Sequence, residues 1–455
     1  MIESISCIGY RGFASKQTLN LAIPNGKPGS GLTILVGPNG GGKSTLIECF
    51  NKIATKRNAT FSKGKRNIKA GNRVEIEVNI DGETGALRTI KGGTQTEWTG
   101  PSVPKIYHLP SRRSFSPFFS KTDWSRQIYL DQQQSTQFRS SSLDSYTSRL
   151  VNINKNGSVS FDEMITRILG KPFKWTIDQE DNGQFFVDIA KSNGTHHNSD
   201  GMGEGILSLM FIVDALCGDG DEFVVIDEPE LSLHPQLQIR LLKEILERTK
   251  KSQMVISTHS PNLLSLESIA NDGIVARVYD SSTGTKINEI DERSRKFIIS
   301  TIKNYNNPHI LGTDARSCFF AEDRLIITEG QEDVVLYPRI INELGKEASI
   351  PFFGYGAGGA ANIIEVAHLL NKLGFNKIGA VYDGDKEDDY NKFVKEFSTL
   401  GYKAWIIPAD DIRDKEPYMS GPKNGLMDKD RKYVKEEYKE RLCSMFDEIK
   451  SFLAV

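Results

Sequence analysis

The chain has 455 residues, a length that predicts two or three domains rather than a single core. Hydrophobic residues make up 38% and charged residues 25%, which is ordinary for a soluble globular protein. The formal net charge of −2 excludes a global field that draws the protein onto DNA, so nucleic-acid contacts must come from local basic patches.

The sequence was searched for a secretory signal, a membrane-spanning stretch and paired cysteines, and none of these patterns is evident. The N-terminal segment MIESISCIGYRGF lacks a cationic start followed by an apolar run, so we expect no signal peptide. The longest apolar stretch, residues 205–217, contains Asp214 and is too short to span a bilayer. The five scattered cysteines form no CxxC pair and resemble small buried residues in a reducing compartment. We therefore expect a cytoplasmic protein without a membrane partner.

The first part of the chain is predicted to be an α/β domain with an insertion. Residues 131–150 are rich in Gln and Ser, which predicts a mobile or inserted region. Residues 73–80 alternate apolar and polar side chains, as in a half-exposed strand. The other predicted strands are 2–8, 32–36, 222–227 and 253–257, and the predicted helices are 43–54, 204–216 and 235–250.

From about residue 320, strands and helices alternate afresh, which predicts a second domain with a parallel sheet. We place the first domain at 1–315, with an inserted helical region at about 115–195, and the second at 316–455. No heptad repeat is sustained, so a long coiled-coil arm is not expected.

The loop 37-GPNGGGKST-45 fits the phosphate-binding pattern G-x-x-x-x-G-K-[ST] between a predicted strand and helix. Its glycines let main-chain N–H groups surround phosphates, and the helix N-terminus adds positive potential. Lys43 would reach the β- and γ-phosphates, and Ser44 would hold Mg²⁺. The candidate ATP-binding residues of the loop are Gly37, Asn39, Gly40, Gly42, Lys43, Ser44 and Thr45.

Two further strand ends carry groups suited to ATP hydrolysis. In 222-EFVVIDEPELSLHPQLQ-238, Asp227 would support Mg²⁺ and Glu228 would orient or deprotonate the attacking water. In 253-QMVISTHSP-261, His259 would sense the γ-phosphate. We predict Glu228 and His259 as catalytic residues of an ATPase.

This combination resembles the ABC-type ATPase head of the RecF and structural-maintenance-of-chromosomes group. The segment 198-NSDGMGEGI-206 is similar to the group's signature motif, although it is not LSGGQ. The resemblance implies that Ser199, Gly201 and Gly203 contact ATP bound by a second subunit, in a homodimer or higher symmetric oligomer. Gln127 and Gln132 to Gln134 are candidates for the family's Q-loop glutamine, with a solvated insertion as the alternative.

Carboxylates also follow two predicted strands of the second domain. Glu329 follows the strand in 324-RLIITEGQEDVVLYPRI-340, and Asp383 and Asp385 follow the one in 378-IGAVYDGDKED-388. Ligands of α/β sheets bind at such strand ends. Two carboxylates at i and i+2, joined by a third on a neighbouring strand, suit Mg²⁺ or Mn²⁺ and phosphodiester cleavage. The alternative is that these acids only solvate loops.

This arrangement resembles a Toprim domain, a compact Rossmann-like fold. The run 319-FFAEDRLIITEGQEDV-334 is similar to its start in the OLD family of ATP-dependent nucleases, whose plan Gabija-type antiphage nucleases share. The resemblance implies Glu329 as metal ligand or general base and Asp383 and Asp385 as metal ligands, with Glu332 as a second-metal candidate.

The chain departs from that family at its later acidic pair. The nearest text is 409-ADDIRDKEP-417, which makes Asp410, Asp411 or Glu416 the candidates. Lys423 is a candidate for stabilising phosphoryl charge. These departures leave open a degenerate Toprim domain that does not cleave.

A basic run at 56–73 contains seven Lys or Arg residues and no acid. Within it, Lys63, Lys65 and Arg66 are candidates for contacting DNA phosphates, as are residues 111–113, with a solvated loop as the alternative. We expect duplex DNA held by its backbone.

The resemblance as a whole implies an OLD-type DNA endonuclease or nickase gated by an ATPase dimer, with a role in antiphage defence by analogy. One alternative is an ATPase sensor or scaffold that controls a separate effector protein. Another is a repair protein that uses the Toprim domain only to bind DNA.

Overall fold

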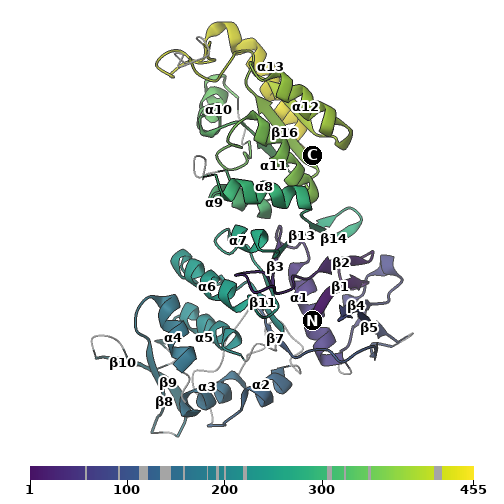
Figure 1. Ribbon diagram of the computed structural model, residues 1–455, viewed down its shortest axis with the longest axis vertical. Coiled ribbons are helices and arrows are strands. Elements are labelled where there is room, and N and C mark those ends of the chain that lie inside the picture. The colour runs from purple at the N-terminus through teal and green to yellow at the C-terminus, as the bar shows by residue number, and fades with distance from the viewer. Residues whose placement is uncertain are drawn as a thin grey trace. The chain divides into compact units, whose positions relative to one another are not determined.

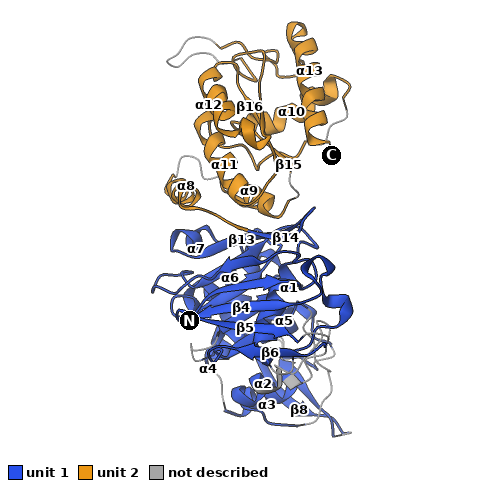
Figure 2. Ribbon diagram, turned by 90° about the vertical axis from the view of Figure 1, so that its right-hand side faces the viewer, with its two compact units in different colours: residues 1–287 blue, residues 288–455 orange. Residues whose placement is uncertain are grey.

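The computed structural model describes the chain in two compact units, Met1–Ile287 and Asn288–Val455 (Figure 2). Its description leaves out residues 57–58, 91–92, 112–120, 134–144, 157–158, 182, 191–193, 199–200, 219–222, 305–309, 322–323, 347–349, 415–422 and 455.

The predicted boundary between residues 315 and 316 is corrected to 287/288. Helix α8 (Glu292–Ile302) belongs to the second unit because it packs on α11 (Ala360–Lys372). The Arg293 guanidinium donates to both carboxylate oxygens of Glu365 at 3.0 and 2.8 Å, and His368 Nε2 lies 2.8 Å from Asp291 Oδ2. These contacts join residues distant in sequence, so no local pattern marked the boundary.

A six-stranded sheet forms the centre of the first unit, in the order β14-β13-β3-β12-β11-β7 (Figure 1). Strands β3, β11 and β12 are buried along their whole length, as is usual for parallel strands covered on both faces. The bounds of its strands are β3 Leu32–Val36, β7 Ile106–Leu109, β11 Phe223–Asp227, β12 Met254–Ser257, β13 Ile274–Ser281 and β14 Gly284–Glu289. The helices connected to these strands are α1 Lys43–Thr55, α5 Glu204–Leu216, α6 Pro235–Arg248 and α7 Leu266–Ala270.

An antiparallel sheet in the order β2-β1-β4-β5-β6 packs beside α1. One hydrophobic core contains Ile5 of this sheet, Phe50 of α1 and Val225 of the parallel sheet, so the three elements support one another. The alternating burial of β4 confirms the half-exposed strand predicted from its sequence. The bounds are β1 Ile2–Ile8, β2 Gln17–Asn20, β4 Glu75–Ile80, β5 Glu83–Thr89 and β6 Thr96–Thr99, with short 3₁₀ turns η2 Lys63–Lys65 and η3 Ile68–Ala70.

The region predicted as an inserted helical segment is only partly helical. Its helices are α2 Arg126–Gln133, α3 Ser145–Asn156 and α4 Val159–Leu169. They are followed by a small antiparallel sheet of β8 Lys174–Gln179, β9 Phe185–Ala190 and β10 His196–His197, which the sequence analysis did not predict.

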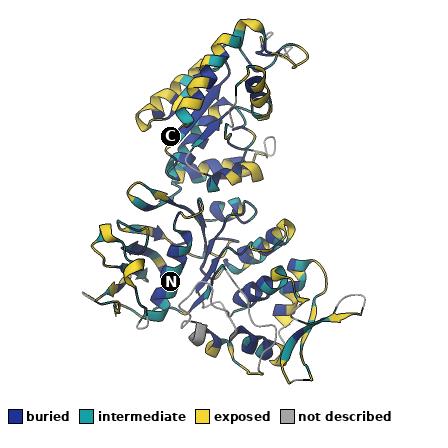
Figure 3. Ribbon diagram, turned by 180° about the vertical axis from the view of Figure 1, so that it is seen from behind, coloured by how far each residue is buried: buried dark blue, intermediate teal, exposed yellow. Residues whose placement is uncertain are grey.

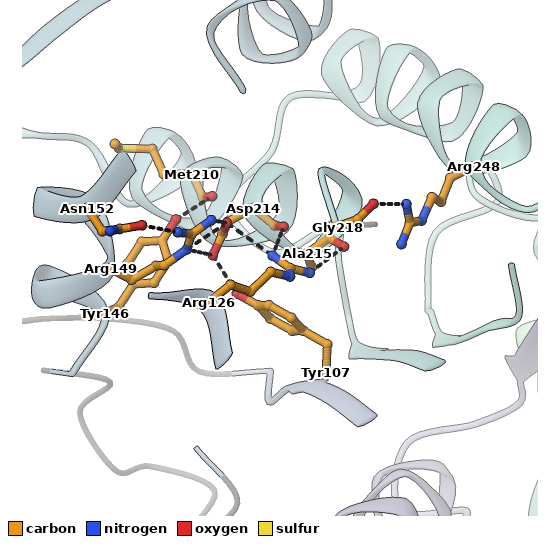
Figure 4. Close-up of polar contacts among 10 residues, drawn as sticks. All are labelled: Tyr107, Arg126, Tyr146, Arg149, Asn152, Met210, Asp214, Ala215, Gly218 and Arg248. Carbon is orange, nitrogen blue, oxygen red and sulfur yellow. Dashed lines mark hydrogen bonds and ion pairs between the residues drawn. The ribbon is translucent and has the colours of Figure 1, made fainter. Parts of the chain in front are cut away.

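A buried carboxylate joins the inserted helices to α5 (Figure 4). Asp214, 1% exposed, accepts from Tyr107 at 2.9 Å and lies 3.2 Å from Arg126 of α2 and 3.0 Å from Arg149 of α3. Arg126 also donates to the main-chain oxygen of Asp214 at 2.6 Å. This network explains the acid inside the apolar stretch 205–217: its carboxylate is the shared counter-ion of two guanidiniums that are mostly covered.

Replacing Asp214 by asparagine is expected to lower the free energy of unfolding by about 3 kcal/mol, because two largely buried guanidiniums lose their counter-charge. Urea denaturation followed by circular dichroism measures the change. The matched control is Asp181→Asn, an exposed position in the turn between β8 and β9. Equal stability of the two variants contradicts a central role for the network.

The second unit is built on a three-stranded parallel sheet in the order β15-β16-β17, in agreement with the predicted parallel sheet. Its strands are β15 Arg324–Ile327, β16 Lys377–Tyr382 and β17 Lys403–Ile406. Besides α8 and α11, its helical elements are α9 Thr313–Ser317, η5 Cys318–Phe320, α10 Gln331–Glu343, α12 Glu387–Phe397, η6 Ser398–Leu400 and α13 Glu436–Leu453. Ile326, Val381 and Phe446 belong to its hydrophobic core.

Burial follows the sheets: the central strands of each unit are buried, while the outer faces of the helices are exposed (Figure 3). In the part of the chain that the structure describes, no helix has both the length and the apolar composition needed to cross a membrane.

Candidate functional site

The phosphate-binding loop lies between β3 and α1, as predicted, and its conformation requires glycine. Gly37 has φ +126°, and Gly42, the residue before α1, has φ +108°. A Cβ on Gly37 would lie 2.3 Å from the carbonyl oxygen of Val278 on β13. Any side chain at this position would therefore push the loop away from the sheet.

A cavity of about 440 Å³ opens above the loop. It brings together six predicted nucleotide-binding residues with Glu228 and His259, the two residues predicted to catalyse ATP hydrolysis. The loop, Glu228 and His259 follow three different strands. The lining residues are Arg11, Asn39, Gly40, Gly41, Gly42, Lys43, Ser44, Thr45, Glu228 and His259. Gly37 is not part of the lining but holds Lys43 through its carbonyl oxygen.

Lys43 is folded back onto its own loop. Its Nζ donates to the carbonyl oxygens of Gly37 at 2.8 Å and Pro38 at 3.0 Å. Burial lowers the pKa of Lys43 to about 8, against the opposite effect of Glu228 and Asp227. The amine is therefore mostly protonated at pH 7 and places a positive charge at the cavity.

The ends of β11 and β12 are joined directly. Asp227, 3% exposed, pairs in register with Ser257 and accepts from its hydroxyl. The next residue, Glu228, donates its N–H to the carbonyl oxygen of Ser257 at 2.9 Å and has φ +51°, an uncommon value for a non-glycine residue. This strained turn brings the Glu228 carboxylate to the cavity.

His259 faces Glu228 across the cavity, with Nε2 3.8 Å from Glu228 Oε1. Burial lowers the pKa of His259, and the nearby Lys43 lowers it further. The imidazole is therefore neutral at pH 7 and can exchange hydrogen bonds with a phosphate or a water without adding a charge.

Arg11 is a further residue of the cavity, and the sequence alone did not point to it. Its guanidinium lines the cavity, donates to Thr45 Oγ1 at 3.3 Å and binds both carboxylate oxygens of Glu48 on α1. Arg11 has φ +48° and lies inside the turn that the N–H of Phe13 closes by donating to the carbonyl oxygen of Tyr10 at 3.0 Å. The only sequence feature that could have indicated this role is the position of Arg11 between Tyr10 and Gly12, just after the first strand.

Glu230 was also missed. Its Oε1 accepts the main-chain N–H of His259 at 2.6 Å, so the turn after β11 is linked to the turn after β12. Burial raises the pKa of Glu230, because its carboxylate is largely removed from solvent. Its position in the run DEPE gave no indication that it supports His259.

Replacing Glu230 by alanine is expected to lower the turnover of ATP about tenfold to a hundredfold with little change in KM, because the His259 turn loses its anchor. Glu230→Gln keeps an acceptor for the same N–H and should retain most activity. Glu247→Ala, on α6, is the control because Glu247 is exposed and pairs with Lys250. Steady-state hydrolysis measures all three; equal rates for Glu230→Ala and Glu247→Ala would exclude the role.

The signature-like segment lies outside this cavity. Gly203 is the residue before α5, and neither it nor Gly201 is part of the cavity lining. Ser199 falls outside the described residues. Of the Q-loop candidates, Gln127 accepts from Lys105, whereas Gln134 and the side chains of Gln132 and Gln133 are outside the description.

In the second unit, two of the predicted acids meet at the carboxyl ends of β15 and β16. Glu329 Oε1 accepts the main-chain N–H of Asp383 at 2.9 Å. Burial raises the pKa of Glu329, so its ionised form is less favoured than that of an exposed glutamate. We call the strand ends that carry Glu329, Asp383 and Asp385 the carboxylate edge.

The other two predicted metal ligands, Asp385 and Glu332, are paired with cations. Asp385 accepts from Lys423 and, at 3.1 Å, from Lys386. Burial acts to raise the pKa of Asp385, but the two lysines outweigh it and the pKa is lowered. Glu332 forms an ion pair with Arg413. The lysine suggested for phosphoryl charge, Lys423, is thus bound to a predicted metal ligand.

Of the later acids, Asp410 accepts the N–H of Asn424 at 3.1 Å, Asp411 is 1% exposed and accepts the N–H of Arg413 at 3.3 Å, and Glu416 is outside the description. Among the described residues, no three His, Cys, Asp or Glu side chains are grouped so that they could hold a metal ion. Two of the four predicted metal ligands, Asp385 and Glu332, are engaged by cations in this arrangement.

Comparisons with known proteins give partial matches. Residues 111–265 match the family model described as "AAA domain, putative AbiEii toxin, Type IV TA system". The first unit contains an ATPase-type domain. The matched residues include Asp227, Glu228 and His259, whereas the phosphate-binding loop lies before them.

Two curated relatives share low identity with the chain. The Septu protein PtuA of Bacillus thuringiensis is 24% identical over 280 residues, which are 52% of this chain and 68% of PtuA. The endonuclease GajA of Bacillus cereus (strain VD045) is 27% identical over 205 residues, 43% of this chain and only 28% of GajA. The chain thus spans less than a third of GajA.

Solved structures give distant matches to heads of structural-maintenance-of-chromosomes proteins. The head domain from Thermotoga maritima covers 64% of this chain and 99% of its own, with 15% identity and a TM-score of 0.39. A head bound to the C-winged helix domain of ScpA covers 65% of this chain and 99% of its own length, with 15% identity and a TM-score of 0.43. These scores are too low to support a function or an assembly.

The three residues predicted to contact DNA differ in their exposure and in their contacts within the protein. Lys63 is exposed and Lys65 is half-buried. Arg66 donates to the carbonyl oxygens of Phe61 at 2.9 Å, Asn72 at 3.4 Å and Gly93. Arg66 therefore stabilises its own loop, and a contact with DNA would compete with these bonds. Residues 112 and 113 lie outside the description.

Proposed function

We propose that the protein binds ATP with Mg²⁺ in the first unit and hydrolyses it. The observation that carries this proposal is the cavity in which Lys43, Glu228 and His259 meet above a glycine loop. The loop N–H groups and Lys43 would bind the β- and γ-phosphates. Ser44 and Asp227 are the residues that would hold Mg²⁺, which shields phosphate charge when bound.

In this proposal Glu228 orients the attacking water and accepts its proton. Neutral His259 donates a hydrogen bond to the γ-phosphate or its attacking water, and Glu230 holds the His259 turn in place. Because Gly201 and Gly203 lie outside the cavity lining, we further propose that they contact ATP bound by a second copy, in a symmetric dimer or higher oligomer.

We propose as a second activity that the carboxylate edge cleaves DNA in a nuclease of the OLD type, with duplex DNA as substrate and antiphage defence as the role. The similarity to the endonuclease GajA and the contact between Glu329 and Asp383 favour it. Lys423 and Lys386 bind Asp385 in this structure, so a metal ion would compete with these lysines for its carboxylate. The competing function is an ATPase sensor whose second unit does not cleave and which controls a partner protein.

A pair of assays on the full chain tests both activities. Phosphate release from ATP in Mg²⁺ is expected, and its absence would refute the ATPase. Conversion of supercoiled plasmid to nicked circles in Mg²⁺ or Mn²⁺, with and without ATP, is expected of the nuclease. Phosphate release without nicking under any condition selects the sensor.

A further inference from the structure

A second cavity of about 400 Å³, which we call the side cavity, adjoins the cavity above the phosphate-binding loop. The Arg11 side chain lines both cavities, so the two spaces meet at this residue. Residues 66–69 line one part of the side cavity, and residues at the end of β13 and the start of β14 line another. Ligand pockets commonly have volumes of about 300–1,000 Å³, so the side cavity can hold part of a bound molecule.

Both parts of the lining are attached to the turn that contains Arg11. The N–H of Arg11 donates to the carbonyl oxygen of Lys65 at 2.9 Å, and the amide of Asn67 donates to the carbonyl oxygen of Arg11 at 2.6 Å. On the other side, the N–H of Thr285 on β14 donates to the carbonyl oxygen of Gly12 at 2.9 Å. Hydrogen bonds to the backbone therefore hold the side cavity in place beside the loop.

Asp280, near the end of β13, is the only acid among the described residues that line the side cavity, where three cations surround the same space. Its side chain is exposed and forms no hydrogen bond or ion pair within the described part of the chain. The residue before it, Tyr279, lies against the phosphate-binding loop, since a Cβ on Gly41 would be 3.0 Å from the Tyr279 Cα. Because a carboxylate repels phosphate, Asp280 suits a part of the nucleotide that donates hydrogen bonds.

We propose that Asp280 binds the ribose hydroxyls of ATP and makes the site select ribonucleotides over deoxyribonucleotides. An ionised carboxylate only accepts hydrogen bonds, and the 2′- and 3′-hydroxyls of ribose can donate two. An acidic side chain serves the 2′-hydroxyl in the same way in dinucleotide-binding sites of another fold. The sugar of dATP lacks the 2′-hydroxyl and leaves one of these bonds unmade. The inference rests on the proposed binding of ATP, since it assigns the ribose of that same nucleotide.

Ile68 offers the base an apolar surface that does not read its edge. Its side chain is 81% exposed and lines the side cavity. The polar side chains before it are engaged within the protein: Asn67 Oδ1 accepts the N–H of Lys69 at 2.9 Å, and Arg66 donates to three main-chain carbonyl oxygens. Contact with Ile68 therefore contributes to the binding of any base, whereas Asp280 distinguishes the sugars.

Titration calorimetry with ATP and with dATP tests the assignment, in Mg²⁺ and in a Glu228→Gln background that should bind nucleotide without hydrolysing it. This parent is expected to bind ATP about tenfold more tightly than dATP, the usual effect of one lost hydrogen bond to a charged group. In Asp280→Ala the two affinities should agree within about twofold. Glu97→Ala removes an exposed acid of β6 that does not line the side cavity, and it should keep the tenfold preference.

Ile68→Ala separates the base from the sugar in the same experiment. It should weaken ATP and dATP alike, by about fivefold, because apolar contact with the base is lost while Asp280 is kept. The ratio of the two affinities should then equal that of the parent. Circular dichroism checks that each variant folds.

A preference for ATP over dATP that survives in Asp280→Ala overturns the assignment, as does a parent that binds both nucleotides equally. The proposed ATPase fails separately. If ATP binds with a preference that Asp280→Ala abolishes, but the unsubstituted chain releases no phosphate, the ribose assignment stands and hydrolysis is lost. Phosphate release together with equal affinity for ATP and dATP keeps the ATPase and removes the assignment. A chain that binds neither nucleotide loses both.

Discussion

Replacing Lys43 by alanine is expected to lower ATP turnover about a hundredfold to a thousandfold, the usual cost of removing a cation directed at charge that develops in the transition state. Lys43 is the one lysine in the cavity lining, and its Nζ is held within the loop by Gly37 and Pro38. Phosphate release measures the effect. Lys250→Ala is the matched control because Lys250 lies in the same unit and pairs only with the exposed Glu247 among the described contacts.

The lowered pKa of Lys43 makes this prediction dependent on pH. The charged amine binds phosphate, and its pKa of about 8 means that it loses its proton between pH 7 and 9. The dissociation constant for ATP should therefore rise about tenfold over that range, with proton uptake on binding at pH 9. Titration calorimetry measures both. Affinity that is constant from pH 7 to 9, or wild-type turnover in Lys43→Ala, would contradict the assigned role.

The parts of the ATPase site that sequence predicted are those with a local cause. The glycine loop needs positive φ values and a helix start within a few residues, and both are written in consecutive letters. In the same way, the apolar run before Asp227 ends where β11 ends. Spacing and residue type are enough for such features because the backbone joins them directly.

Arg11 and Glu230 could not be assigned in this way, because their roles depend on contacts across the fold. Arg11 reaches Thr45 and Glu48 only after β1 and α1 pack together. Glu230 supports His259 only because β11 and β12 are neighbours in the sheet. The domain boundary was misplaced for the same reason: the ion pairs that hold α8 on α11 join residues more than a local window apart.

At the carboxylate edge, the sequence predicted where the acids lie but not which cations bind them. The sequence correctly suggested that Glu329 and Asp383 lie at neighbouring strand ends, where they now share a hydrogen bond. It could not reveal that Lys423 and Lys386 bind Asp385, because the ion pair with Lys423 brings together residues from different loops. An acid pattern alone therefore does not separate a metal site from an acid–lysine cluster.

Asp383→Ala/Asp385→Ala is expected to reduce plasmid nicking about a hundredfold or more if the carboxylate edge is catalytic, since both acids follow the central strand of the sheet. The control is Glu387→Ala/Asp388→Ala, which removes the same charge from exposed positions at the start of α12. Gel analysis of supercoiled plasmid in Mn²⁺ or Mg²⁺ measures the rates.

The outcome distinguishes the two functions of the second unit. Nicking that is lost in Asp383→Ala/Asp385→Ala and kept in the control makes the edge a nuclease site. Equal nicking by both variants places cleavage elsewhere. If the wild type hydrolyses ATP but nicks under no condition, the second unit serves binding or signalling controlled by the ATPase.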